Sequence, residues 1–294
     1  MLGVRGSTPA PGAAFVRYGG HTSCVAVLAD ADRVPHLVLD AGTGLRDLAE
    51  LTDGRPFHGA VVLSHLHWDH LQGLPFCPAL DHPDARVDLW IPATGELATT
   101  SGPGNAAASS LLARAMSPPH FPIGPDGLLG SWEFRPARPG DLPLGPGAGD
   151  VRVRVAEVEH KGGETFVIRV DLDGASVAYL PDHNRPIGRP HPLAGAELIH
   201  GVDALLHDGQ FIDGEAGTAL RYGHSTIEDA AWLADHCEVG RLVIIHHAPG
   251  RTDDELDELA ARVTRTPDGR PVTFARQGDV LPVRSAVPTP GGRA

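Results

Sequence analysis

The stretch from His65 to His70, which reads His-Leu-His-Trp-Asp-His, constrains this chain more than any other. It follows the apolar run Ala60–Leu63, whose length and composition predict a short buried strand. Three imidazoles and one carboxylate therefore leave the end of one strand together. Imidazole suits zinc and similar metals, and a carboxylate adds negative charge and can hold a second ion. A polar surface turn is the simpler alternative, but histidine and aspartate recur after later strands. We therefore predict a metal site that holds two ions.

The same stretch resembles the HxHxDH signature of the metallo-β-lactamase superfamily. Later motifs of that superfamily have counterparts here in the same order, namely His160, Asp182 after one strand and His246 after another. Within the superfamily the chain resembles the phosphodiesterase branch, which includes tRNA 3′-processing ribonuclease Z and related cyclic-nucleotide phosphodiesterases. The opening segment Gly3–Pro9 and the loop Gly223–Thr226 carry this closer likeness.

The resemblance implies a set of ligands for two divalent ions, with Zn²⁺ expected and Mn²⁺ as the alternative. Two metal ions that share a hydroxide need about seven protein ligands and an open position for water. The implied ligands are His65, His67 and His160 on the first ion, Asp69, His70 and His246 on the second, and Asp182 as a bridge between them. The bridging carboxylate offsets positive charge and keeps the two ions close together.

Neighbouring residues compete with two of these ligands. Glu159 is the only other ligand-type side chain beside His160, and His247 directly follows His246. The order of a strand and then a histidine favours His246. Asp40 also ends an apolar run, and the resemblance gives it a supporting role behind the ligand loop. A simple turn cap is an equally good interpretation of Asp40.

The loop Gly223–Thr226 carries the sharpest functional prediction. His224 lies just before a predicted helix over Ser225–His236, where free backbone N–H groups favour an anionic ligand. Ser225 and Glu228 have the spacing of a capping box for this helix. The resemblance places His224 near the scissile phosphate. A histidine that merely packs before Ser225 is the alternative.

The resemblance also implies three catalytic residues, which are His224, Asp208 as its acidic partner, and the ligand Asp69. Ribonucleases of this branch show Glu-Ala-Thr at the acidic position, whereas this chain has Asp-Gly-Gln from Asp208 to Gln210. The difference argues against tRNA processing and leaves phosphodiester chemistry intact.

The charge of the chain also argues against a long nucleic acid as substrate. The formal net charge is −13, from 24 Lys and Arg against 37 Asp and Glu, and Lys161 is the only lysine. Proteins that grip long nucleic acids need basic patches, because phosphate contacts dominate the affinity. A small anionic substrate remains compatible, since bound metal ions would supply positive charge locally.

The cysteines and the apolar runs bear on location. Three cysteines, far apart and without a CxxC pair, indicate reduced thiols and a cytoplasmic protein. No secretory leader and no apolar run of about twenty residues is present, so neither secretion nor membrane insertion is expected. Leu2–Val4 resembles the end of an opening strand, so either this edge strand is short or the chain begins earlier. A homodimer is plausible.

Strand-like runs along the whole chain, with helices between them, predict two sheets with helices outside. The resemblance makes this an α+β fold, a four-layer αββα sandwich with metals at one edge between the sheets. We expect one domain over residues 1–283 and a flexible tail at 284–294. A Pro/Gly-rich, loop-rich insertion at 95–150 is expected near the active-site mouth, and a disordered linker between two domains is its alternative.

These features predict a metal-dependent hydrolase with two metal ions that acts on phosphodiesters. In this reaction a metal-bridging hydroxide attacks phosphorus, and His224 protonates or stabilises the leaving oxygen. The expected substrate is a small nucleotide-like or cyclic-nucleotide diester, and large RNA is not expected as a partner. A carboxylic ester, thioester or lactam hydrolase on the same fold is the alternative. A non-catalytic metal-binding sensor protein is the alternative from another class.

Overall fold

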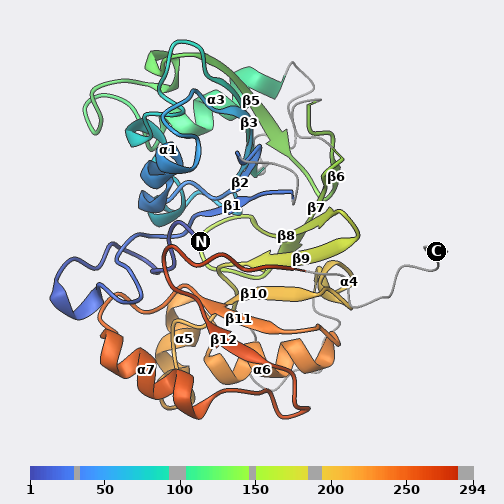
Figure 1. Ribbon diagram of the computed structural model, residues 1–294. Helices are drawn as coiled ribbons and strands as arrows, with labels where there is room; N and C mark the ends of the chain where they lie inside the picture. Colours follow the sequence, from blue (N-terminus) through green and yellow to red (C-terminus); the bar gives the residue numbers. More distant parts are fainter. Residues whose placement is uncertain (30–33, 93–103, 146–149, 185–193, 284–294) are drawn as a thin grey trace.

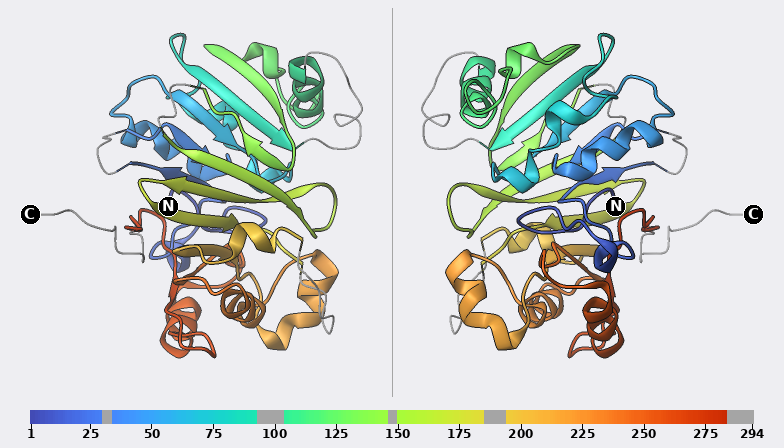
Figure 2. Two further views of the ribbon diagram at one scale, coloured as in Figure 1. Left: turned by 90° about the vertical axis from the view of Figure 1, so that its right-hand side faces the viewer. Right: turned by 90° about the vertical axis from the view of Figure 1, so that its left-hand side faces the viewer.

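Two β-sheets stacked face to face form the centre of the molecule, and helices cover both outer faces (Figures 1 and 2). The computed structural model describes residues 1–29, 34–92, 104–145, 150–184 and 194–283. None of the helices in these ranges is long and apolar enough to cross a lipid bilayer.

The first sheet has five strands whose order in space is their order along the chain. They are β1 (Val25–Val27), β2 (Leu37–Leu39), β3 (His58–Val62), β4 (Arg86–Pro92) and β5 (Ser131–Ala137). Strand β1 is antiparallel to β2, and the remaining neighbours are parallel. On the outer face lie the helices α1 (Leu48–Leu51) and α3 (Gly104–Ala113) (Figure 1).

The second sheet has seven strands in the order β12, β11, β10, β9, β8, β7 and β6. Along the chain these are β6 (Gly140–Leu142), β7 (Arg152–Val158), β8 (Thr165–Leu172), β9 (Ala175–Leu180), β10 (Ala204–Asp208), β11 (Leu242–Ile245) and β12 (Val272–Phe274). Strands β9 to β12 are parallel, and β6 to β9 pair as antiparallel neighbours. The helices of this half are α4 (Ala196–Ile199), α5 (Ala216–Tyr222), α6 (Ile227–His236) and α7 (Asp253–Arg262).

Short 3₁₀ helices complete the regular structure. They are η1 (Ala13–Phe15), η2 (Thr43–Asp47), η3 (Trp68–His70), η4 (Leu74–Phe76), η5 (Pro125–Gly127) and η7 (Asp213–Glu215). The helix η3 is the last part of the His65–His70 stretch, so the ligand-type residues there turn sharply instead of continuing the strand.

Three apolar cores explain the layers. Successive side chains of a strand point to opposite faces of the sheet. Leu37 and Leu39 of β2 therefore lie in the core between the sheets, and Val38 packs in the core beneath α1 and α3. In β10, Leu206 belongs to the central core and Leu205 packs in the core with α6. The predicted four-layer αββα sandwich is confirmed.

The Pro/Gly-rich stretch 95–150 contributes to both sheets. Strand β5 pairs with β4 along its whole length, and β6 pairs with β7. Residues 95–103 and 146–149 of this stretch lie outside the described residues, as does the predicted tail 284–294. A single domain over residues 1–283 stays a prediction.

The capping box of α6 lies one residue later than the sequence indicates. Thr226 Oγ1 accepts a hydrogen bond from Asp229 N at 3.1 Å, and the Asp229 carboxylate accepts one from Thr226 N at 3.3 Å. The predicted Ser225–Glu228 box is therefore wrong. Ser225 Oγ instead donates to the backbone oxygen of His183 at 2.6 Å, which ties the start of this helix to the segment after β9.

Candidate metal centre

The predicted ligands meet because they follow strands whose ends lie at one edge of the molecule. Strands β7, β9 and β11 run in the same direction in the second sheet, so the segments that follow them leave at the same edge. His160, Asp182 and His246 follow these strands closely. The stretch His65–His70 follows β3 of the first sheet and reaches the same place from the other side.

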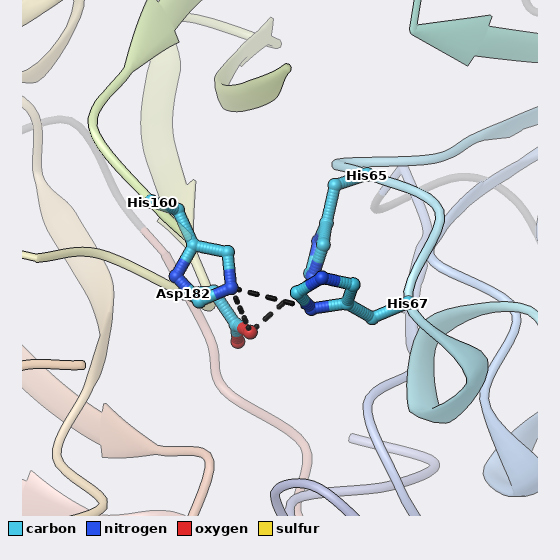
Figure 3. A group of neighbouring side chains, drawn as sticks. All are labelled: His65, His67, His160 and Asp182. Carbon is cyan, nitrogen blue, oxygen red and sulfur yellow. Dashed lines mark hydrogen bonds and ion pairs between the residues drawn. The ribbon is translucent and has the colours of Figure 1, made fainter. Parts of the chain in front are cut away.

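Three histidines and one carboxylate form the first half of the cluster (Figure 3). Asp182 Oδ2 lies 3.3 Å from His65 Nε2 and 3.3 Å from His160 Nε2. His67 Nδ1 lies 3.3 Å from His160 Nε2. One candidate ligand atom from each of the four residues lies within 4.8 Å of the others.

The second half of the cluster contains the remaining predicted ligands. Asp69 Oδ2 lies 3.2 Å from His70 Nε2 and 3.1 Å from His246 Nε2. Asp182 Oδ1 lies 3.3 Å from His70 Nε2 and 2.9 Å from His246 Nε2. The two oxygens of the Asp182 carboxylate therefore face different halves, which is the arrangement that a bridging ligand requires.

The spacing and the unpaired atoms both fit divalent cations. Two ligand atoms that are each 2.0–2.1 Å from a tetrahedral Zn²⁺ lie roughly 3.3 Å apart. Among the described residues, the buried atoms His65 Nε2, His70 Nε2 and Asp182 Oδ1 make no hydrogen bond of ordinary geometry, and other ligand atoms of the cluster face them. Buried polar atoms without partners are costly, and metal coordination would satisfy them. The seven residues thus fit a pair of divalent ions.

Hydrogen bonds behind the cluster orient its imidazoles. His70 Nδ1 donates to Asp40 Oδ2 at 2.7 Å, and His160 Nδ1 donates to the backbone oxygen of Gly223 at 2.6 Å. These bonds leave the Nε2 lone pairs toward the cluster. Asp40 is fully buried and also accepts from Ser64 Oγ at 2.9 Å and Tyr179 OH at 2.8 Å. Asp40 therefore orients the ligand His70 from outside the cluster.

The structure distinguishes His246 and His160 from the residues next to them in the chain. His247 is buried with Nε2 donating to the backbone oxygen of Ala275 at 2.9 Å, outside the cluster. Glu159 is exposed, whereas the imidazole of His160 lies in the cluster. Among the described residues, the ligand groups include His246 and His160 but neither competitor.

The charges of the two halves differ. Burial lowers the pKa of His65 and of His160, in each case to about 4. Burial also acts on His246, but the carboxylates of Asp182 and Asp69 outweigh it and raise the pKa of His246 to about 10. The second half of the cluster therefore takes up positive charge readily, as protons or as metal ions.

His224 and Asp208 form a hydrogen-bonded pair beside the cluster. His224 Nδ1 donates to Asp208 Oδ2 at 3.0 Å, and the same oxygen accepts from Ser225 N at 3.1 Å. The imidazole of His224 stacks on that of His246, with 5.2 Å between ring centroids. The ring of His224 is therefore held between a buried carboxylate and the cluster.

A pocket of about 370 Å³ opens onto this arrangement. Its lining residues are Ser7, Leu66, His67, Trp68, Asp69, Asp182 and His224. The pocket therefore presents parts of both halves of the cluster and the His224 imidazole to the same space.

The opening segment contributes contacts that sequence reasoning missed. Ser7 N donates to Asp69 Oδ2 at 2.8 Å. A Cβ at Gly6 would lie 2.4 Å from His246 Nδ1, so this glycine permits the backbone to approach that ring. Gly6, one of two glycines in the Gly3–Pro9 motif, was a signal for such a close approach, but nothing in the sequence indicated His246 as its partner.

The fold and the cluster define a protein of the metallo-β-lactamase fold. The metallo-β-lactamase fold protein YhfI from Bacillus subtilis matches with a TM-score of 0.65 and 17% identity, over 94% of this chain and 95% of that one. The short form of human tRNase Z matches with a TM-score of 0.62 and 18% identity, over 96% of this chain and 98% of that one. At these identities the likeness shows the fold alone.

The sequence comparisons give the family. A family model described as "Beta-lactamase superfamily domain" matches residues 36–247, and the chain belongs to that family. The ribonuclease Z of Exiguobacterium sp. (strain ATCC BAA-1283 / AT1b) is 28% identical over 259 residues, which cover 76% of this chain and 84% of the relative. The chain is a hydrolase of this fold, and the predicted resemblance is confirmed.

Proposed function

We propose that the protein is a metal-dependent phosphodiesterase that hydrolyses a small nucleotide-like diester, with cyclic nucleotides among the candidates. The observation that carries the proposal is the His224–Asp208 pair, which stands 3.0 Å apart at the wall of the same pocket as the ligand cluster. His224 also shares a possible ligand group with Asp182 and His246, and we assign it proton transfer to a leaving group because a buried carboxylate orients its ring.

The metal ions have a defined place in this proposal. We assign His65, His67, His160, Asp69, His70, His246 and Asp182 to two divalent ions, Zn²⁺ first and Mn²⁺ as the alternative. When bound, such ions activate a water molecule and neutralise negative charge on a phosphoryl oxygen.

The protein side chains supply proton transfer and orientation. Asp208 accepts the Nδ1 hydrogen of His224, so Nε2 is the atom left to donate a proton to the leaving oxygen. Asp69 lines the pocket with its Oδ2 held by Ser7 N, and we assign it the orientation of the attacking water.

The pocket supports a small substrate. Its volume of about 370 Å³ lies in the range of sites for small molecules. The indole of Trp68 lines it and is 73% exposed, which leaves an aromatic surface on which a nucleobase can stack. A diester with a planar base would use both this surface and the polar side of the pocket.

RNA is the second candidate substrate, because sequence relatives carry the name ribonuclease Z. The net charge of −13 and the single lysine oppose it, since long nucleic acids bind through many phosphate contacts. We also propose a cytoplasmic location, in keeping with three cysteines that the structure leaves free and buried.

A substrate panel tests the proposal. Zinc-loaded protein is assayed with cyclic nucleotides, bis(p-nitrophenyl) phosphate, a phosphomonoester, a thioester, a lactam and a precursor tRNA. We expect hydrolysis of the small diesters and weak, strongly salt-dependent binding of tRNA. Efficient site-specific trimming of the tRNA at physiological salt would favour the second candidate. Turnover of the thioester or lactam alone would return the carboxylic ester, thioester and lactam alternatives, and no turnover at all would favour a metal-binding sensor.

A further inference from the structure

Ser7 stands at the wall of the pocket and is held there from two sides. Its backbone N–H donates to Asp69 Oδ2 at 2.8 Å, and its Oγ accepts a hydrogen bond from Gln210 Nε2 at 2.9 Å. Gln210 is 5% exposed and lies two residues after Asp208, whose Oδ1 accepts from Gln210 N at 2.9 Å. The carboxylate that orients His224 thus also fixes the residue that holds Ser7.

The bond from Gln210 determines what the Ser7 hydroxyl can do. A hydroxyl has one hydrogen to donate, and an amide NH₂ can only donate. Because Ser7 Oγ accepts from Gln210, its own hydrogen points elsewhere. Ser7 lines a pocket whose other polar walls include the carboxylates of Asp69 and Asp182. A neutral donor among acceptors suits an oxygen that carries negative charge on the ligand.

The backbone of Ser7 has a conformation that is unfavourable for a residue with a side chain. Its φ of 63° lies in the left-handed region, where glycine is the least strained residue. Glycine at position 7 would keep the backbone N–H that donates to Asp69, so that bond does not require a side chain. What glycine would lose is the hydroxyl.

We propose that the Ser7 hydroxyl binds a non-bridging phosphoryl oxygen of the substrate. Gln210 is the positioning residue that turns the hydroxyl toward it. The inference rests on the proposed function, since it names the group that recognises the phosphoryl centre in the same pocket. It also applies to any phosphoryl compound that reaches the site, including inorganic phosphate.

The test uses zinc-loaded protein and inorganic phosphate, with bis(p-nitrophenyl) phosphate as the substrate. Ser7→Gly should unfold close to the wild-type temperature, because the backbone strain that it removes offsets the lost hydrogen bond from Gln210. It should keep the wild-type metal content, weaken phosphate binding about ten-fold or more, and raise KM more than it lowers kcat. Asp173→Gly is the matched control, since Asp173 also has a left-handed φ, of 52°, but lies in the turn between β8 and β9.

Gln210 variants test the direction of the hydrogen bond. Gln210→Met removes the donor without adding charge and should weaken phosphate binding less than Ser7→Gly does. Gln210→Glu can accept the Ser7 hydrogen, which would turn it away from the pocket, and should weaken binding more than Gln210→Met. The double variant Ser7→Gly with Gln210→Met should bind phosphate no more weakly than Ser7→Gly alone.

The outcomes separate this inference from the proposed function. Unchanged phosphate affinity in Ser7→Gly would overturn the inference and leave diester hydrolysis standing. Loss of metal in Ser7→Gly would also overturn it, because Ser7 would then act through Asp69. A wild type that binds no phosphate would overturn it as well. If phosphate binding follows Ser7 while no diester is hydrolysed, the anion site stands and the proposed function fails.

Discussion

The Oδ1 atom of Asp182 lies 2.9 Å from the Nε2 atom of His246. The other oxygen of the same carboxylate faces His65 and His160, at 3.3 Å from each Nε2. One aspartate therefore contacts both halves of the cluster. His247, which directly follows His246 in the chain, contacts the backbone oxygen of Ala275 and not the cluster.

Asp182→Ala should lose most of the bound metal, because both halves of the cluster lose a ligand atom. Wild-type protein should hold close to two transition-metal ions per chain after reconstitution, as measured by elemental analysis. His247→Ala is the control, and it should keep two ions even if removal of a buried ring lowers its stability. Only trace metal in the reconstituted wild type would contradict the two-ion centre, as would equal losses in the two variants.

His224→Ala should lower turnover of a diester by roughly 10²- to 10⁴-fold without changing the metal content, because one general acid is removed. A diester with nitrophenolate as leaving group needs little protonation and should lose less. Asp208→Asn should also lower turnover, but to a smaller extent, since Asp208 only orients the imidazole of His224. The measurement is kcat on poor and good leaving groups. Equal losses on both would make His224 a binding residue, and no loss on either would make it a structural one.

Asp40→Asn should weaken binding of the second ion by about 10- to 100-fold, because the charged acceptor of His70 Nδ1 is lost. Asparagine tolerates the left-handed φ of 58° at this position, so the backbone should be retained. Competition with a chromophoric zinc chelator measures the affinity. Asp53→Asn is the matched control at a φ of 54° on an exposed turn. Equal affinity in both variants would restore the turn-cap interpretation of Asp40.

The metal-free protein should be most stable near neutral pH. The pKa of His246 is raised to about 10, so its contribution is complete below about pH 6.5 and is lost as the pH rises toward 10. The pKa values of His65 and His160 are lowered to about 4, so stability falls as the pH drops from about 6.5 toward 4. Thermal unfolding of chelator-treated protein at a series of pH values measures both limbs. His246→Gln should flatten the alkaline limb, and stability that rises from pH 7 to 9 without metal would contradict the assignment.

Trp68→Ala should reduce kcat/KM for thymidine 5′-p-nitrophenyl phosphate about ten-fold more than for methyl p-nitrophenyl phosphate. The two substrates release the same leaving group and differ only in the nucleoside, so the ratio isolates base stacking. Trp68→Phe should recover most of the difference. Phe76→Ala serves as control, because Phe76 is 60% exposed and does not line the pocket. If the ratio of kcat/KM for the two substrates is the same in the wild type and in Trp68→Ala, Trp68 does not recognise the base.

The sequence was informative where the ligands follow strands. The apolar run before His65–His70 and the short strands before Asp182 and His246 are local patterns, and the structure places all these residues in one cluster. The strands and the helices between them predicted two sheets with helices outside, and the family resemblance specified the four-layer sandwich.

The questions that the sequence left open depend on the backbone. Ser7, Asp40 and His246 have left-handed φ values of 63°, 58° and 58°. Six non-glycine residues in the described part of the chain have positive φ, so half of them lie at this site. A left-handed residue breaks the alternation of a strand, and its side chain then points where no periodic pattern predicts. The order of a strand and then a histidine favoured His246 over His247, but nothing in the sequence indicated this backbone geometry.

The prediction of the capping box of α6 was wrong for a different reason. Ser225 and Thr226 are both good capping residues with an acidic residue three positions on. The choice between them was made by a contact from another part of the chain, the backbone oxygen of His183. Local preference alone could not distinguish two equal candidates.

The ligands come from both sheets, and this has a mechanical consequence. His65 and His70 follow β3 of the first sheet, whereas Asp182 and His246 follow β9 and β11 of the second. Ions held by both groups would crosslink the two halves of the sandwich at one edge, beside a central core that is otherwise held by apolar contacts. A chelator would then act on the whole fold and not only on the reaction. After the ions are removed, the two sheets would no longer be linked at this edge, and we expect them to separate at this edge first.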